Sequence, residues 1–419
     1  MTDTTSHSAK FLLLFILFLP LHIAWGQEEV ASSWQVKGFV DTYHAVRSEK
    51  PNNFMSSRTR IRGEIAKSFE GSSLFVSFNA TYNALLKERT GFELREAYLD
   101  HRDDHWGFRL GRQLVIWGAA DGVRITDLVS PMDMTEFLAQ DYDDIRMPVN
   151  ALRLFVFNDK MKLELLAVPT FEGYKLPTDA INPWCILPKD SPLPIAWEEN
   201  GSHPSLHFAN IEYGGKLSFT LPGVDFSLSA LHTWNKMPVF TYRPTDTHIV
   251  VSPQYYRMGF FGGDISKPLG QLVLRGEAAF NVGKHFSYRP DASDQDQKGF
   301  NTVNYLVGID WYAPKDWVVM AQFSSESILK YEDQIAQPHH NSLLTLNVSK
   351  KLLDNTLQLS NFTYFDLNHK GWFSRFTAAY SLNDFIQLSL GYDWFGGDEG
   401  MFSTYKNNSE VWAKAKYSF

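Results

Sequence analysis

The chain ends with the stretch VWAKAKYSF, residues 411–419. Apolar residues occupy every second position from Val411 to Phe419, and Lys414 and Lys416 stand between them. A period of two indicates a β-strand with one apolar face and one face in water. The strand ends on a phenylalanine with no polar tail, so the rest of the sequence must explain what each face contacts.

Composition narrows the class of protein. The chain has 419 residues, a formal net charge of −8, and 15% aromatic residues. A negative chain without a basic stripe does not favour nucleic acid as a partner. The single cysteine, Cys185, excludes an internal disulfide. No histidine near it forms a catalytic pattern, so we do not expect it to act as a nucleophile.

The N-terminus predicts export from the cytoplasm. Lys10 precedes an apolar run from Phe11 to about Trp25, and small residues around Gly26 suit a signal peptidase. The run is short for a membrane-spanning helix, so a retained anchor is the less favoured alternative. We therefore expect residues 1–26 to be a cleaved Sec signal peptide and residues 27–419 to form one envelope domain of a Gram-negative cell.

Strand-like segments follow one another through the mature chain. We count about 18, with 16 as a possible alternative. Short turns such as LPGVD and LNDF alternate with longer connections. Short turns on one rim and long loops on the other are typical of outer-membrane barrels, with the short turns in the periplasm. The fold class is therefore all-β, a single antiparallel transmembrane barrel. The predicted strands include Trp106–Trp117, Phe226–Tyr242 and Gln254–Lys267. The predicted long loops include 118–148, 172–205, 242–252 and 396–409.

Charged residues should mark the inner face of this barrel. A charge that faces acyl chains costs about 2–4 kcal/mol at the middle of the bilayer. The charged positions of each strand must then face the lumen, and the opposite positions must contact membrane lipid and lipopolysaccharide. Aromatic residues near strand ends suit the two membrane interfaces. The predicted pore-lining residues are Arg58, Arg60, Arg62, Glu64, Arg153, Arg275, Glu277, Asp310, Lys414 and Lys416.

The same reasoning explains the C-terminal stretch. The last strand closes the barrel, with its apolar positions toward lipid and its lysines toward the lumen. Phe419, preceded by Tyr417, looks like the sorting signal that the barrel-assembly machinery of the outer membrane reads. We therefore expect this machinery to be a partner.

A longer region resembles a known family. It contains Gly111-Arg112-Gln113, Trp117-Gly118 and Ser130-Pro131-Met132-Asp133. With VPTFEGYKLP, 168–177, and NYLVGIDW, 304–311, it resembles a set of porin-like Gram-negative barrels of unknown function, similar to the alginate-export barrels. The resemblance is densest from 92 to 177 and implies an 18-stranded barrel. Alginate-export lumens are rich in arginine, whereas the inward positions of this chain mix both signs.

The first long loop is the best candidate for a constriction. Residues 119–149 are rich in charge, and MTEFLAQDYDDIR predicts a short helix with Thr135 near its start. Loops that fold into the opening set pore selectivity. An exposed acidic loop on the rim is the alternative, and a calcium site at Asp141, Asp143 and Asp144 is disfavoured because the spacing matches no EF-hand. The candidate constriction residues are Arg124, Asp127, Asp133, Asp141, Asp144 and Arg146.

The sequence therefore predicts a channel for passive diffusion of small polar or charged solutes. One alternative is a dedicated transporter, an exporter or importer of a polysaccharide or a hydrophobic compound. Another is a non-conducting scaffold whose lumen is filled. No nucleophile–base pattern, phosphate loop or metal motif occurs, so we expect no enzyme activity, no cofactor and no metal.

Overall fold

The computed structural model describes residues 34–142, 144–188, 191–199, 203–289 and 297–419. The expected signal peptide at 1–26, the expected new N-terminus at Gln27 and Asp143 lie outside these ranges.

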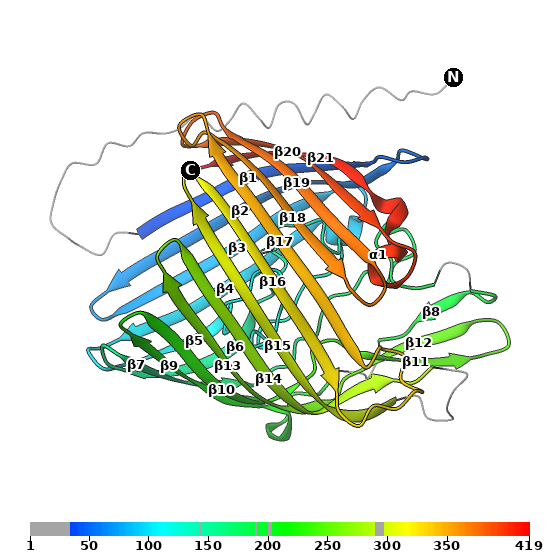
Figure 1. Cartoon of the computed structure of the whole chain (residues 1–419), viewed down its shortest axis with the longest axis horizontal. Helices are drawn as coiled ribbons and strands as arrows, with labels where there is room; N and C mark the ends of the chain where they lie inside the picture. The colour runs from blue at the N-terminus through cyan, green and yellow to red at the C-terminus, as the bar shows by residue number, and fades with distance from the viewer. Residues whose placement is uncertain (1–33, 143, 189–190, 200–202, 290–296) are drawn as a thin grey trace. The chain divides into compact units, whose positions relative to one another are not determined.

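Eighteen antiparallel strands form one closed sheet (Figure 1), as the sequence predicts. Each strand pairs with the next barrel strand along the chain, and β1 pairs with β21 to complete the ring. The barrel strands are β1 (Trp34–Arg47), β2 (Phe54–Phe69), β3 (Ser72–Asn83), β4 (Gly91–Arg102), β5 (Trp106–Gln113), β6 (Val149–Phe157), β7 (Met161–Val168), β9 (Glu212–Leu221), β10 (Val224–Trp234), β13 (Arg257–Leu269), β14 (Leu272–Ser287), β15 (Gln297–Ala313), β16 (Trp317–Ile328), β17 (His340–Leu352), β18 (Leu357–Asp366), β19 (Gly371–Ser381), β20 (Ile386–Gly396) and β21 (Glu410–Ser418).

The C-terminal strand has the two faces that its sequence predicts. Val411 is 48% exposed on the outside, whereas its neighbour Trp412 is 3% exposed on the inside. The final residue completes the ring, because Phe419 and Gly38 exchange two backbone hydrogen bonds of 3.0 and 2.9 Å. A Cβ on Gly38 would lie 2.8 Å from the Phe419 ring, so the ring seats only over a glycine. The last residue therefore extends the antiparallel ladder between β1 and β21, which runs from the pair Phe39 and Ser418 to the pair Arg47 and Glu410.

The two rims differ as expected. Tight turns such as 70–71, 222–223 and 270–271 join strands at one rim, and the long connections lie at the other. The long-loop rim also carries α1 (Gly400–Thr404) and the short strands β8 (Ile195–Trp197), β11 (Val239–Pro244) and β12 (Ile249–Gln254) (Figure 1). In the described ranges, the remaining elements are three short 3-10 helices, namely η1 (Lys87–Arg89), η2 (Phe208–Asn210) and η3 (Lys406–Asn408). Within the described residues, no helix has the length and apolar character to cross a bilayer.

One predicted strand, Phe226–Tyr242, is too long: its first part, to Trp234, belongs to β10, and the rest is not part of the wall. The chain leaves the wall after Trp234, and β11 and β12 form a hairpin in a separate three-stranded sheet with β8. Pro238 lies in the break and has no N–H to donate to a ladder. The predicted loop 242–252 is consequently part of that hairpin, and the next wall strand begins at Arg257 rather than at Gln254.

The predicted strand Trp106–Trp117 is also too long. It ends at Gln113, because side chains take up the following backbone N–H groups. Glu96 accepts from Leu114 N at 2.9 Å, and Ser130 Oγ accepts from Val115 N at 2.9 Å. The helix expected in MTEFLAQDYDDIR is absent from its described residues, which form turns with Phe137 at a φ of 48°. The short helix of this rim is α1 instead, in the predicted loop 396–409.

Candidate functional site

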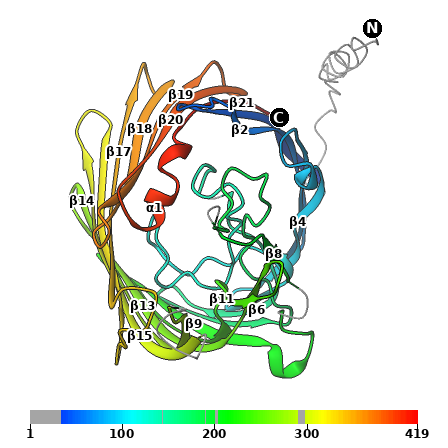
Figure 2. The ribbon, with the colours of Figure 1, turned by 90° about the vertical axis from the view of Figure 1, so that its right-hand side faces the viewer.

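Residues 114–148 form a loop that lies inside the ring of strands (Figure 2). We call it the lumen loop. Its ends are held by β5 and β6, which are neighbours in the wall, so the whole segment must fold inward or stand above the rim. Hydrogen bonds from its residues to several separate wall strands show that it folds inward, and the alternative of an exposed loop on the rim does not hold.

Glu277 on β14 anchors the first part of the lumen loop. One carboxylate oxygen accepts from Ala119 N and Ala120 N, both at 2.7 Å. The other oxygen accepts from the backbone N–H of Thr126 at 3.1 Å and from its hydroxyl at 2.8 Å. Glu277 is 4% exposed, so these bonds use the carboxylate almost completely. The structure places this predicted pore-lining residue on the inner wall, where it binds the loop.

The arginines of β2 anchor the opposite part of the loop. Arg58 lies 2.5 Å from Glu136, and Arg62 lies 3.0 Å from Asp144. Arg60 bridges two carboxylates, Asp41 on β1 at 2.8 Å and Asp144 on the loop at 2.9 Å. All three arginines therefore point toward the lumen loop, and each makes an ion pair that joins the wall to the loop.

Two loop carboxylates are held ionised by these wall cations. Burial opposes ionisation of Asp144, but Arg60 and Arg62 outweigh it and hold the pKa of Asp144 well below its usual value. Burial acts on Asp141 in the same way. Lys414 on β21, 2.6 Å away, and Arg375 outweigh it and lower the pKa of Asp141. Both carboxylates are therefore charged at neutral pH and hold the loop to positively charged wall residues.

The other predicted lining residues form pairs of several kinds. Arg153 binds Glu164 at 2.8 Å, and Glu164 also accepts from the Trp117 indole of the lumen loop at 2.9 Å. Arg275 lies 2.6 Å from Asp310 and donates to the carbonyl of Ala119 at 2.7 Å.

For Lys416 and Glu64, the two remaining predicted lining residues, the structure gives an aromatic contact and partial burial. The Lys416 ammonium lies 4.3 Å from the centre of the Phe39 ring. Glu64 is half-buried on β2.

The remaining constriction residues fix the loop's own shape. Arg124 donates to the carbonyls of Asp127 and Ser130 and to the Tyr174 hydroxyl, and Arg146 lies 3.3 Å from Asp127. Asp133 lies 2.6 Å from Arg89 of η1. Burial opposes ionisation of Asp133, but Arg89 and the Thr135 hydroxyl outweigh it and lower its pKa. These groups therefore brace the loop more than they present charge to the lumen.

The close approach of the loop to β18 requires a glycine. Gly122 has a φ of 75°, a left-handed backbone conformation that favours glycine. The Tyr364 hydroxyl donates to its carbonyl at 2.7 Å, and a Cβ on Gly122 would overlap that same hydroxyl.

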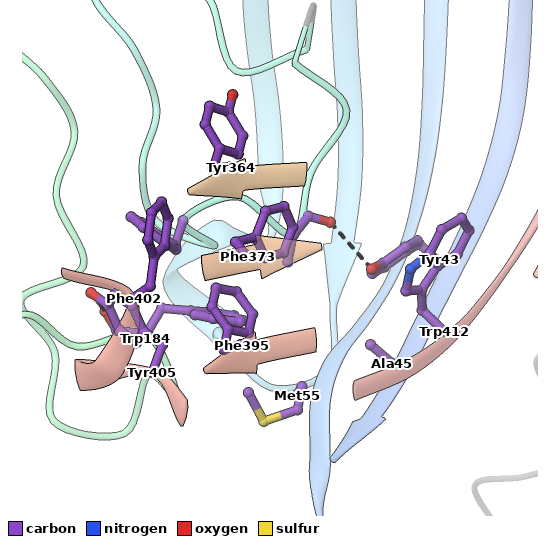
Figure 3. Packing of buried hydrophobic residues seen from close by; sticks show 12 residues of the cluster. Tyr43, Ala45, Met55, Trp184, Tyr364, Phe373, Phe395, Phe402, Tyr405 and Trp412 are labelled. Carbon is purple, nitrogen blue, oxygen red and sulfur yellow. Dashed lines mark hydrogen bonds between the residues drawn. The ribbon is translucent and has the colours of Figure 1, made fainter. Parts of the chain in front are cut away.

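An aromatic cluster inside the barrel was not predicted. It joins Phe137 of the lumen loop and Trp184 of the second long loop, the connection that follows β7, to Phe402 of α1 and to Tyr405 just after it (Figure 3). Trp184 is fully buried, and its carbonyl accepts from the Tyr405 hydroxyl at 3.2 Å. The available signal was the presence of large aromatic residues at inward positions. The wall contributes Tyr43, Ala45, Met55, Tyr364, Phe373, Phe395 and Trp412, and the lumen loop adds Ala139.

No group of three or more histidine, cysteine, aspartate or glutamate side chains suited to a metal occurs in the part of the chain that the structure describes. Two of the three aspartates considered for calcium lie in the described residues, and both have other partners. Asp141 binds Lys414, and Asp144 binds Arg60 and Arg62.

Comparison with known proteins supports the fold. Residues 29–179 match the family described as "Protein of unknown function (DUF1302)", which overlaps the region of resemblance found in the sequence. No curated protein matches the chain.

Solved outer-membrane proteins resemble the chain in structure. Pseudomonas aeruginosa OccK11 (OpdR) aligns with a TM-score of 0.54 at 7% identity, over 92% of this chain and 96% of that one. OmpT of Vibrio cholerae, as a loop L8 deletion mutant, aligns with a TM-score of 0.46 at 8% identity over 93% and 100% of the two chains. The anion-selective porin from Comamonas acidovorans aligns at 0.43 and 11% identity over 93% and 100%. At these identities the likeness concerns the fold alone, an antiparallel β-barrel such as the one in OccK11 (OpdR).

Proposed function

We propose that the protein is an outer-membrane channel for passive diffusion of small polar or charged solutes, narrowed by the lumen loop. The observation that carries the proposal is the attachment of this loop to wall strands around the ring. Glu277 on β14, Arg58 on β2 and Tyr364 on β18 all bind it. A loop fixed at the inner wall sets the width and the charge of the path that a solute must take.

The charges of the wall support a solute that is polar rather than apolar. Inward residues of both signs alternate around the lumen, as in the pairs Arg153–Glu164 and Arg275–Asp310. A narrow water path between such pairs carries a strong local field, which can orient a dipolar solute. We propose no catalytic step and no cofactor, and we propose that the mature chain enters the outer membrane after removal of its signal peptide.

A non-conducting scaffold is the second candidate, and the aromatic cluster favours it. Twelve side chains pack together inside the barrel, and they join both long loops to the wall. If such packing continued around the lumen loop, no water path would remain. The transporter alternative, for a polysaccharide or a hydrophobic compound, stays a prediction.

The test is conductance of the refolded mature chain in a planar bilayer under a salt gradient. Stable open steps with an ion preference support the channel. Replacing Arg58 by glutamine should then move the ion preference toward cations, because a positive charge is lost from the inner wall. The matched control is Arg243→Gln, because Arg243 is 72% exposed in the β11–β12 hairpin and pairs with Glu198 there. No conductance from protein shown to be folded and inserted would favour the scaffold.

A further inference from the structure

Four positively charged side chains lie close together on neighbouring strands of the wall, near the tight turns. We call them the cationic cluster, and its members are Arg102 on β4, Arg109 on β5, Arg153 on β6 and Lys162 on β7. Arg109 and Arg153 are direct cross-strand partners. All three arginines lie close enough to Lys162 to repel its charge. Like charges on facing positions destabilise a sheet, so the wall keeps this cluster at a cost in stability.

Arg102 and Arg109 share one carboxylate. Asp100 on β4 lies 3.2 Å from Arg102 and 2.7 Å from Arg109. Arg102 uses its Nε atom for this contact, and 61% of its side chain is exposed. The stem of Arg102 lies over β5, because a Cβ on Gly107 would lie 3.3 Å from Arg102 Cγ. The end of this side chain is therefore open to water in front of β5.

Arg153 and Lys162 share a second carboxylate. Glu164 lies 2.8 Å from Arg153 but 3.8 Å from Lys162, which is too far for a hydrogen bond. The two cations also share the ring of Phe155, at 5.1 and 4.5 Å from its centre. The Lys162 side chain is 44% exposed. Because Glu164 also accepts from Trp117 of the lumen loop, this part of the cluster faces the lumen.

The charges of the cluster do not balance. Four cations share two carboxylates, which leaves a surplus of two positive charges. Arg102 and Lys162 are the most exposed members and present this surplus to water. The adjoining turns at 103–105 and 158–160 add three aspartates and one lysine, but these are exposed beyond the strands, where water screens their charges. Ion pairs that only stiffen a wall need one carboxylate for each cation, so the surplus indicates a role in binding an anion.

We propose that the cationic cluster binds the dianionic phosphate group of a small solute. Guanidinium and ammonium groups both donate charge-assisted hydrogen bonds to phosphate oxygens, and two surplus charges match a dianion. The two exposed cations converge on β6 from opposite sides. Arg102 crosses β5 at Gly107, which is the cross-strand partner of Phe155, and Lys162 lies over the Phe155 ring. An anion with a single charge neutralises only half of the surplus, so it binds more weakly.

The inference rests on the proposed function and deepens it by naming a class of solute. Arg102 and Lys162 each lie next to a tight turn, so the site is at the mouth of the lumen opposite the long loops. The anion also lowers the repulsion between Arg109 and Arg153. A solute that carries phosphate is therefore held at this mouth, apart from the ion pairs of β2 that fix the lumen loop.

The test compares methyl phosphate with dimethyl phosphate at pH 7.5. The monoester carries nearly two negative charges at this pH, whereas the diester has no second proton to lose. Each is titrated with the refolded full mature chain in an uncharged detergent without phosphorus, and binding is read as phosphorus-31 NMR line broadening beyond that of empty micelles. Wild-type protein should bind the monoester about fivefold more tightly, the factor for one further partly exposed ion pair. Equal binding of the two probes, or no broadening beyond empty micelles, overturns the proposal.

A double variant then assigns the binding to the cluster. Arg102→Gln combined with Lys162→Gln removes the surplus and should weaken binding of methyl phosphate about tenfold. The control is Lys37→Gln combined with Lys351→Gln, because these are two exposed lysines at the same rim, on β1 and β17. The control should bind methyl phosphate within about twofold of wild type. Equal losses in the two folded double variants would indicate general attraction to a positive rim and overturn the site. The two-probe comparison on wild-type protein stands even if the cluster variant does not fold.

The binding test and the conductance test fail separately. Line broadening measures binding at equilibrium and needs no ion flow. A chain that conducts but does not distinguish the two phosphates retains the channel and loses the site. A chain that distinguishes them but never conducts retains the site and loses the channel.

Discussion

Replacing Glu277 by glutamine should release the first part of the lumen loop. The carboxylate accepts four hydrogen bonds from Ala119, Ala120 and Thr126. The amide that replaces it keeps one acceptor atom and turns a donor toward groups that also donate. Hydrogen bonds to a charged group contribute about 1.5–3 kcal/mol each, and bonds that share one carboxylate do not add fully. We expect the docked loop to lose about 2–3 kcal/mol, which raises the undocked population about 30- to 160-fold.

The assay combines single-channel recording with limited proteolysis. Glu277→Gln should show larger and more variable open steps than wild type, and a protease should cut within residues 114–148 sooner. The control is Glu212→Gln, because Glu212 is a buried wall carboxylate that bonds Thr233 and Lys236 rather than the lumen loop. If folded Glu277→Gln matched wild type in both readouts, the carboxylate would not be an anchor and the reasoning would be refuted.

Three further predictions concern the loop, the barrel seam and the N-terminus. Because the pKa of Asp144 is lowered in the docked loop, the stability that its ion pairs contribute is complete above about pH 4, the ordinary range for a free aspartate, and declines progressively as the pH falls from there toward the lowered pKa. Conductance noise should therefore rise in wild type between about pH 4 and pH 2, and should already be present at pH 7 in Asp144→Asn; quiet traces from that variant at pH 7 would contradict the ion-pair anchor. Deleting Phe419 removes both backbone hydrogen bonds to Gly38 and the expected sorting signal. It should lower the folded fraction in outer membranes severalfold, read as heat-modifiable mobility on gels, and wild-type levels would remove the role of this residue in assembly. N-terminal sequencing of protein from outer membranes should begin at Gln27, and an intact Met1 would mean that the leader is retained.

The barrel itself follows from local pattern. Alternation of apolar and polar residues, as in Val411–Phe419, is set residue by residue, because successive strand side chains point to opposite faces. A charged side chain that points outward into the bilayer is strongly destabilising. The inward direction of Arg58 and Glu277 could therefore also be predicted. Strand ends were less certain where the chain leaves the wall, as at Gln113 and Trp234, because there side chains and a proline compete with the ladder.

The partners of the inward residues depend on the tertiary structure. Glu277 accepts a hydrogen bond from Thr126, which lies 151 residues away in the sequence. Arg60 donates to Asp144, which lies 84 residues away. Whether an inward arginine faces water or a loop carboxylate depends on how the loop folds, and no local period encodes that choice. The same holds for Phe137 and Trp184, which look like ordinary loop residues until both long loops pack against one wall.

The sequence by itself thus determined the strands, their faces and the closure of the ring, because each depends on the spacing of neighbouring residues and on the cost of charge in lipid. Only the tertiary structure decided that the arginines of β2 hold a loop, that aromatic side chains fill one side of the lumen, and that four cations of β4 to β7 share two carboxylates. These features arise where segments far apart in the chain meet, and the free energy of such contacts depends on three-dimensional distance rather than on order in the sequence.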